Sequence, residues 1–288
     1  MLTWLQILIL GIVQGAAELL PVSSSAHVIV AEKLMGVVPS SPQAMFVMAM
    51  LHTGTMFAAL FYFWKAWKET FFSTKAKFYT MTWRAAVASI LTVIVGFGLI
   101  TPIEKVFLSK TGMGDIEELS NNMFLIGIAI LIAGVFIIIA GVRRSDRSVG
   151  GGVPVTMQCA AWMGLAQGLC LPFRGLSRSG TTISAGLLAG SNRRRAEEFS
   201  FALAVIVTPG YVGREMLRLH KAYPDSLHDG TITHLLMPGF FGLIASFFAG
   251  LLALRLISNW LEEGRWRYFG YYCMVASVAV FALAAYGY

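Results

Sequence analysis

The sequence predicts an all-α integral membrane protein, and three observations carry this prediction. Of the 288 residues, 57% are hydrophobic and only 13% are charged, and the mean hydropathy is +0.70. A soluble domain carries about 25% charged residues, so this chain could not cover a surface that faces water. The apolar residues form segments of the length that crosses a bilayer as a helix. Two apolar stretches are interrupted by short polar breaks.

Six segments are long enough to span a membrane alone. They are residues 43–64, 82–101, 120–142, 196–217, 235–258 and 267–287. Four shorter segments form two pairs, and the breaks between their members are rich in Pro, Ser and Gly. Non-helical backbone at membrane depth is tolerated only where protein covers it or where it lines a cavity. We therefore predict six transmembrane helices plus two re-entrant helical hairpins, at residues 2–36 and 153–190.

The sequence predicts a single membrane domain, 1–288, that consists of two copies of an internal repeat. The segment Gly11-Ile-Val-Gln-Gly15 matches Gly164-Leu-Ala-Gln-Gly168 just over half the chain later. We place one repeat at about 1–142 and the other at about 153–287, each a hairpin followed by three spans. An odd number of spans inverts the second copy, and inverted repeats with broken helices place their ligand site at the repeat interface.

The positive charge indicates orientation. The net charge is +7, and most Lys and Arg residues lie in the connections 65–84, 143–147, 193–195 and 255–267. The positive-inside rule makes these connections cytoplasmic and places both termini outside. No basic stripe interleaved with aromatic residues indicates a nucleic-acid partner. The three cysteines are irregularly spaced in apolar segments, which favours inert thiols over disulfides or a metal site.

The first break places acidic, basic and hydroxyl groups inside an apolar stretch. Gln14 and Glu18 are four residues apart and share one helix face. A carboxylate in the membrane costs several kcal/mol unless it is paired or hydrated. One serine can cap the next helix, but three in a row beside His27 exceed that need. Glu18, Ser24 and His27 could activate an oxygen nucleophile; the alternative is a structural anchor role for Glu18.

The second break carries two arginines, Arg174 and Arg178. Buried arginines need anionic partners, and Glu18 supplies only one charge. Arginine binds phosphate oxygens bidentately, and the helix that starts near Thr181 directs its free N–H groups to the same place. We therefore predict a phosphate site, with an arginine network bonded to backbone carbonyls as the alternative. The expected phosphate-binding residues are Arg174, Ser177, Ser179, Thr182 and, from the first break, Ser25.

The inverted repeat would bring the two breaks face to face. A base and a nucleophile opposite a phosphate clamp are the layout for phosphoryl transfer. We expect Glu18, Ser24, His27 and Arg178 to be the catalytic residues. A site inside the membrane implies a lipid-borne phosphate, and the acidic residue beside it suggests a divalent cation held by Glu18 and Gln14.

Both breaks resemble signature motifs of the undecaprenyl-diphosphate phosphatase family of the bacitracin-resistance type. The resemblance rests on Gln14-x-x-x-Glu18 with Pro21-Val-Ser-Ser-Ser-Ala-His27 and on Gly175-Leu-Ser-Arg-Ser-Gly-x-Thr182, and it runs nearly end to end. It implies hydrolysis of undecaprenyl diphosphate to undecaprenyl phosphate and inorganic phosphate, which recycles the carrier lipid of cell-wall synthesis. It also implies Mg²⁺ or Ca²⁺, the bacterial inner membrane, and a site on the periplasmic side.

Residue by residue, the resemblance puts Gln14 and Glu18 on the family's acidic motif, and Ser24 and His27 on its Ser…His pair. The phosphate-binding loop falls on Ser177, Arg178 and Thr182. This chain departs from the family at two positions. Many members have Glu where Gln14 stands, and many have Pro where Arg174 stands, which puts the substrate preference in doubt more than the reaction class.

Several alternatives stay open. The nucleophile could be Ser24, a water activated by His27, or His27 itself. A polyprenyl-phosphate flippase or transporter, alone or in addition to the phosphatase, would share the inverted repeat but has no use for the Glu18–Ser24–His27 set. The other class of membrane lipid phosphatases is rejected, because no histidine and aspartate follow Ser177-Arg178 closely. His52, inside a span, is expected to be structural, although it could line the cavity. A homodimer is compatible with the sequence, which does not fix the oligomeric state.

Overall fold

The computed structural model describes residues 2–108, 121–144, 154–224, 232–262 and 265–287, and this part of the chain contains helices and no strand. The predicted all-α class is therefore confirmed. Residues 145–153, where the second repeat is predicted to begin, lie outside the described residues. The helices are α1 (Trp4–Glu18), α2 (Ser24–Leu34), α3 (Pro42–Thr70), α4 (Lys75–Pro102), the π-helix η1 (Ile103–Leu108), α7 (Met123–Arg144), α8 (Met157–Cys170), α9 (Arg178–Leu188), α10 (Arg193–Ala222), α11 (Ile232–Glu262) and α12 (Trp266–Ala285).

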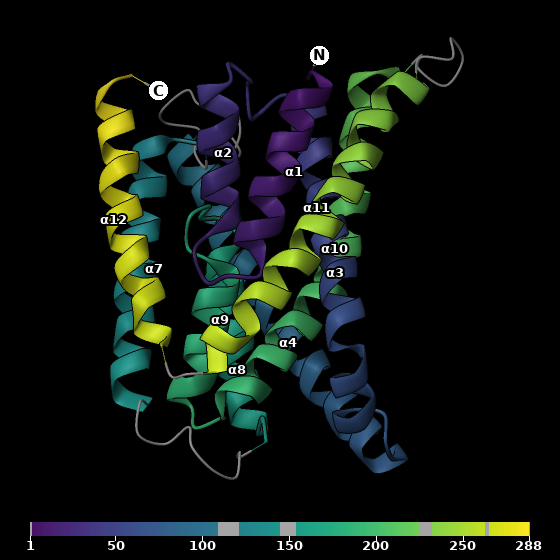
Figure 1. Ribbon diagram of the computed structural model, residues 1–288, viewed down its shortest axis with the longest axis vertical. Helices are drawn as coiled ribbons and strands as arrows, with labels where there is room; N and C mark the ends of the chain where they lie inside the picture. Colours follow the sequence, from purple (N-terminus) through teal and green to yellow (C-terminus); the bar gives the residue numbers. More distant parts are fainter. Residues whose placement is uncertain (1, 109–120, 145–153, 225–231, 263–264, 288) are drawn as a thin grey trace.

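Two helical hairpins enter the molecule from opposite ends. The pair α1 and α2 descends from the end that carries both termini, and the pair α8 and α9 rises from the other end (Figure 1). Their tips touch near the middle, where the hydroxyl of Ser179 donates to the carbonyl oxygen of Leu20 at 3.1 Å. The remaining long helices surround this meeting point. The polar breaks of the sequence therefore lie together inside a helical shell.

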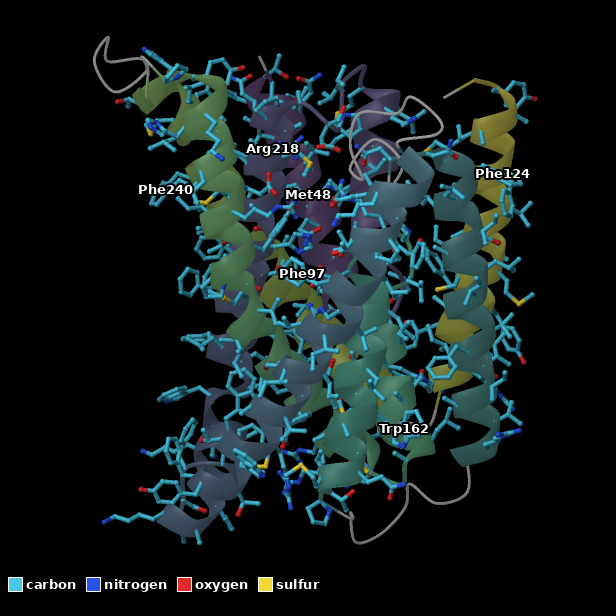
Figure 2. The ribbon with its side chains drawn as sticks, turned by 180° about the vertical axis from the view of Figure 1, so that it is seen from behind. Met48, Phe97, Phe124, Trp162, Arg218 and Phe240 are labelled. Atoms are coloured by element: carbon cyan, nitrogen blue, oxygen red, sulfur yellow. The ribbon has the colours of Figure 1, made fainter. Side chains whose placement is uncertain are left out.

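Five of the described helices are long and apolar enough to cross a membrane: α3, α4, α7, α11 and α12. The protein is thus a multi-pass membrane protein, as predicted. Phe124 and Phe240 project from opposite sides of the bundle, whereas Met48 lies inside it (Figure 2). The predicted span 196–217 lies in α10, which has 30 residues but is not apolar enough to count by composition. The arrangement of six spans plus two hairpins across a bilayer stays a prediction.

Glycines let each hairpin pack closely against a long helix. A Cβ atom on Gly15 of α1 would lie 2.5 Å from Cβ of Ala249 in α11, and one on Gly164 of α8 would lie 2.4 Å from the carbonyl oxygen of Ala88 in α4. Neither distance is compatible with a side chain. Small residues at helix contacts are typical of membrane proteins, where close backbone approach provides much of the packing energy. The matching Gly-x-x-Gln-Gly segments are therefore contact surfaces of the hairpins.

The helices extend past the apolar segments on which their prediction depends. The connection expected at 65–84 contracts to 71–74, because α3 continues to Thr70 and α4 already begins at Lys75. The sequence 65–70, Lys-Ala-Trp-Lys-Glu-Thr, contains good helix formers that do not need a hydrocarbon environment. Thr74 then caps α4 by accepting a hydrogen bond from the backbone N–H of Lys77. Apolarity marks the membrane-crossing part of these helices rather than their ends.

Candidate functional site

At the tip of each hairpin, one serine adopts the left-handed backbone conformation. Ser23 has φ of 68° and Ser177 has φ of 46°, and each is the residue before a short helix, α2 or α9. Non-glycine residues rarely adopt this conformation, and positions that hold it often belong to functional sites. The side chain of Ser177 caps α9 by accepting from the backbone N–H of Gly180. These turns place the first residues of both short helices where the hairpins meet.

The carboxylate of Glu18 is the centre of the site. Its residue is only 8% exposed, and burial of an unpaired charge at this depth would be costly. One oxygen, Oε1, pairs with Nη2 of Arg178 from the second hairpin. The other, Oε2, accepts hydrogen bonds from the hydroxyl of Ser24 and from Nε2 of Gln14, the latter at 2.9 Å. Glu18, Ser24 and Arg178, which the sequence predicts to act together, are therefore in direct contact.

His52 is a further member of the cluster around Glu18. Nδ1 of His52, on α3, lies 3.2 Å from Oε2 of Glu18 and 2.9 Å from Nε2 of Gln14. The ring of Tyr211, on α10, meets the His52 ring edge-on at 6.0 Å. The sequence predicts a structural role for His52, whereas the fold places its ring against Glu18. The signal that could have identified it is an ionisable residue inside a long apolar helix, which is a functional candidate by default.

His27 lies beside this cluster and is bonded elsewhere. Its Nδ1 is 2.8 Å from the carbonyl oxygen of Ser23, and its Nε2 is 2.7 Å from the hydroxyl of Tyr272 on α12. It makes no hydrogen bond to Glu18 or Ser24 in the described structure. His27 and Ser24 are three residues apart on α2, so their side chains are neighbours on one helix face.

The second hairpin contributes one unsatisfied donor. Nη1 of Arg178 is buried and has no hydrogen-bond partner within the described residues. Arg178 is also the first residue of α9, whose N-terminal N–H groups favour an anion. An anion bound here would satisfy the buried guanidinium nitrogen.

Three of the hydroxyls predicted to bind phosphate, those of Ser177, Ser179 and Thr182, have hydrogen-bond partners within the protein. Besides the bond from Ser179 to Leu20, Oγ1 of Thr182 lies 2.8 Å from the carbonyl oxygen of Arg178 and 2.5 Å from Oγ of Ser200 on α10. Ser177 caps α9, and Ser25 is half-buried in the first turn of α2. The bonds of Ser177, Ser179 and Thr182 stabilise the second hairpin, and the Arg178 guanidinium provides a donor that has no partner among the described residues.

Arg174 lies apart from the Glu18 cluster. Its Nη1 donates to Oδ1 of Asn121 at 2.9 Å, and its Nη2 lies 3.1 Å from Sδ of Met45 in the first turn of α3. Asn121 lies two residues before α7, and both α7 and α3 begin toward the end of the molecule that carries the termini (Figure 1). The structure therefore directs the Arg174 side chain away from Arg178, toward that end.

The residues that could hold a cation are few. Among the described residues, no group of three or more His, Cys, Asp and Glu side chains is arranged for a metal. Oε1 of Gln14 is buried and has no hydrogen-bond partner in the part of the chain that the structure describes, and it lies on the same side chain that donates to Glu18. One carboxylate and one amide oxygen suit a hard cation that takes its remaining ligands from phosphate and water, as Mg²⁺ does.

The arrangement can perform chemistry on a phosphate ester or anhydride. The hydroxyl of Ser24 already donates to a carboxylate, which is the geometry of a nucleophile beside its base. The Arg178 guanidinium faces the same carboxylate from the opposite hairpin and has a spare buried donor. A nucleophile, a base and a cation thus converge in a place from which bulk water is largely excluded.

The sequence is similar to proteins of known family. The model of the family described as "Bacitracin resistance protein BacA" matches residues 7–279. Undecaprenyl-diphosphatase 2 of Acinetobacter baylyi is 47% identical over 286 residues, which are 97% of this chain and 98% of that protein. The undecaprenyl-diphosphatase of Korarchaeum cryptofilum is 30% identical over 96% of this chain and 98% of its own length. That of Renibacterium salmoninarum is 31% identical over 99% of this chain and 97% of its own. The chain belongs to the bacitracin resistance protein BacA family.

Proposed function

We propose that this protein hydrolyses undecaprenyl diphosphate to undecaprenyl phosphate and inorganic phosphate. The observation that carries the proposal is the buried contact of Glu18 with Arg178 from one hairpin and Ser24 from the other. Relatives that align over nearly the whole chain are named undecaprenyl-diphosphatases, which supports the same reaction. A site at the centre of a membrane protein suits a substrate whose chain lies in the bilayer.

Substrate binding uses the second hairpin. The terminal phosphate takes the buried Nη1 of Arg178 and the free N–H groups at the start of α9. It competes with Glu18 for Nη2 of the same guanidinium. Binding of the phosphate thereby loosens the hold of Arg178 on the carboxylate and makes Glu18 a stronger base. The isoprenoid chain extends between helices into lipid.

In the first chemical step, the oxygen of Ser24 attacks the terminal phosphorus. Its proton passes to Oε2 of Glu18, with which it already shares a hydrogen bond. The bond between this phosphorus and the bridging oxygen breaks, and undecaprenyl phosphate leaves. Arg178 stabilises the charge that spreads over the phosphoryl oxygens, which is the main catalytic requirement of phosphoryl transfer.

In the second step, water hydrolyses the phosphoserine. Nε2 of His27, one helical turn from Ser24, takes a proton as the water oxygen attacks phosphorus. The Ser24–phosphorus bond breaks, and Glu18 returns the proton to the serine oxygen. Gln14 and His52 hold the Glu18 carboxylate in place throughout. The products are inorganic phosphate and, once His27 has released its proton to bulk water, a regenerated site.

A divalent cation, Mg²⁺ or Ca²⁺, is part of the proposal. Glu18 and the unpartnered Oε1 of Gln14 would hold it together with oxygens of the diphosphate. When bound, it neutralises phosphate charge. Removal of divalent cations with EDTA should therefore lower phosphate release, and Mg²⁺ should restore it.

We further propose the bacterial inner membrane as the location, with the site opening to the periplasmic side. The described parts of the Lys- and Arg-rich connections, which are the turn between α3 and α4 and the first turns of α10 and α12, lie at the end opposite the termini (Figure 1). The positive-inside rule makes that end cytoplasmic. α2, which carries Ser24 and His27, runs from the centre toward the other end.

The test is phosphate release from undecaprenyl diphosphate by the purified protein. Ser24→Ala and Arg178→Lys should each lower release by at least about 100-fold, because one lacks the nucleophile and the other lacks the planar clamp. Ser73→Ala, at an exposed serine in the turn before α4, is the matched control and should keep normal activity. Normal turnover in Ser24→Ala would reject the serine mechanism. Lipid translocation in vesicles without phosphate release would favour the carrier instead.

A further inference from the structure

We propose that Tyr272 is a positioning residue of the site, which acts by orienting His27. The proposal rests on the proposed function, in which His27 takes a proton from water. Tyr272 lies on α12, far from both polar breaks in the sequence, and no motif marks it. Its hydroxyl nevertheless lies 2.7 Å from Nε2 of His27, which is the nitrogen required for catalysis.

The two bonds of the imidazole fix its tautomer. The carbonyl oxygen of Ser23 can only accept, so Nδ1 of His27, at 2.8 Å, must carry a hydrogen and donate it. In the neutral ring Nε2 then has a lone pair, and the Tyr272 hydroxyl donates to it. The tautomer of a histidine is set by the bond at its other nitrogen. Here Ser23 and Tyr272 together select the form that can accept a proton at Nε2.

The plane of the imidazole is fixed as well. The rings of His27 and Tyr272 are stacked, with centroids 5.7 Å apart and planes 12° from parallel. The next residue, Cys273, is buried, and its Sγ lies 3.5 Å from the carbonyl oxygen of Pro21 at the hairpin tip. Two successive residues of α12 therefore contact the first hairpin on either side of the α2 start.

The location favours a role in catalysis. α12 packs chiefly on α7, and α2 packs chiefly on α1, so side chains rather than a broad helix contact join α12 to α2. Tyr272 is 48% exposed. In the proposed second step a water displaces the Tyr272 hydroxyl from Nε2 of His27, because the nitrogen has a single lone pair. The displaced phenol then holds this water by a hydrogen bond.

The experiment compares kcat and KM for phosphate release by the full-length protein with Tyr272→Phe and with Tyr271→Phe. Tyr271 is the matched control, because it is the neighbouring tyrosine, is 46% exposed, and packs its ring edge-on against that of Tyr268 on the same helix. Loss of one hydrogen bond that orients a base should lower kcat about tenfold with KM unchanged. Tyr271→Phe should leave both values unchanged.

Two further measurements separate positioning from mere packing. In a His27→Gln background, Tyr272→Phe should cause no further loss of kcat, since residues that act as a unit are not additive. The ¹⁵N NMR signal of the His27 imidazole, assigned by its absence in His27→Gln, should shift in Tyr272→Phe and stay in place in Tyr271→Phe.

Equal kcat in the two phenylalanine variants would overturn the proposal, and so would an equal further loss in the His27→Gln background. An unshifted NMR signal in Tyr272→Phe would also overturn it. If the wild-type protein released no phosphate at all, the proposed function would fail, and the NMR comparison would still decide whether Tyr272 holds His27.

Discussion

The carboxylate of Glu18 contacts residues of both hairpins. Replacing Glu18 by Gln removes the charge that Arg178 pairs with and the base that Ser24 faces, while the size of the side chain is kept. We expect Glu18→Gln to lower phosphate release by at least about 100-fold. Glu69→Gln, at an exposed glutamate near the end of α3, is the control and should keep wild-type activity. Turnover within a few-fold of wild type in Glu18→Gln would remove this carboxylate from the mechanism.

A substitution at Gln14 tests whether a divalent cation binds at the site. Nε2 of Gln14 donates to Glu18, and its Oε1 has no partner among the described residues. Gln14→Glu would place two carboxylates side by side, which need a cation between them to avoid repulsion. Half-maximal activity in Gln14→Glu should therefore require several-fold less Mg²⁺ than in the wild type. Gln6→Glu, in the capping box of α1, should leave this Mg²⁺ requirement unchanged. An unchanged requirement in Gln14→Glu would show that no cation binds here.

The sequence predicts the contact of Glu18, Ser24 and Arg178 because each is a costly polar group in an apolar stretch. It cannot predict His52 or Tyr272 as neighbours, since each belongs to a long helix outside the two polar breaks and only the packing of that helix brings it to the site. Composition also does not reveal how the hydroxyls are bonded. Thr182 bonds locally to the carbonyl oxygen of Arg178, as serine and threonine often do, whereas Ser179 bonds to Leu20 of the other hairpin.

At the scale of the helices, close contact between backbones makes a specific prediction. Gly164→Ala would place a Cβ 2.4 Å from the carbonyl oxygen of Ala88, so α8 and α4 must move apart. We expect a loss of about 1–3 kcal/mol of stability. Gly98→Ala, on α4 where nothing lies within 4 Å, should be neutral or gain up to about 1 kcal/mol from helix propensity. Thermal unfolding of both variants in detergent measures the difference, and an equal midpoint for the two would contradict this packing.

The helix boundaries cannot be predicted from hydropathy alone. A helix ends where its hydrogen bonds are capped or its backbone turns, and neither event depends on apolarity. α3 and α4 therefore continue into polar sequence until Phe71 and Thr74. In α10, a long helix is not recognised by hydropathy. It is one of the longest helices, but its charged ends lower its mean hydropathy. The hairpins, in contrast, were predictable because Pro, Ser and Gly interrupt apolar sequence in both.

At the scale of the whole molecule, the distribution of charge predicts which end faces the cytoplasm. Ser73→Cys, in the turn between α3 and α4, should react with an impermeant thiol reagent only when the cytoplasmic side is open. Val38→Cys, 63% exposed between α2 and α3, should react from outside intact cells. The three native cysteines are replaced by Ala beforehand. The opposite labelling pattern would reverse the orientation and place the α2–α3 connection in the cytoplasm.

The ion pair between the hairpin tips has a consequence for the order in which the protein assembles in the membrane. Glu18 and Arg178 are 160 residues apart, so the ribosome completes the first hairpin long before the partner of its carboxylate exists. An unpaired carboxylate is not stable in hydrocarbon. Until then, we expect the hairpin tip to stay near the membrane surface or to hold Glu18 in its protonated form. The contact between Glu18 and Arg178 forms when the second hairpin arrives, so the two halves of the site join late in assembly.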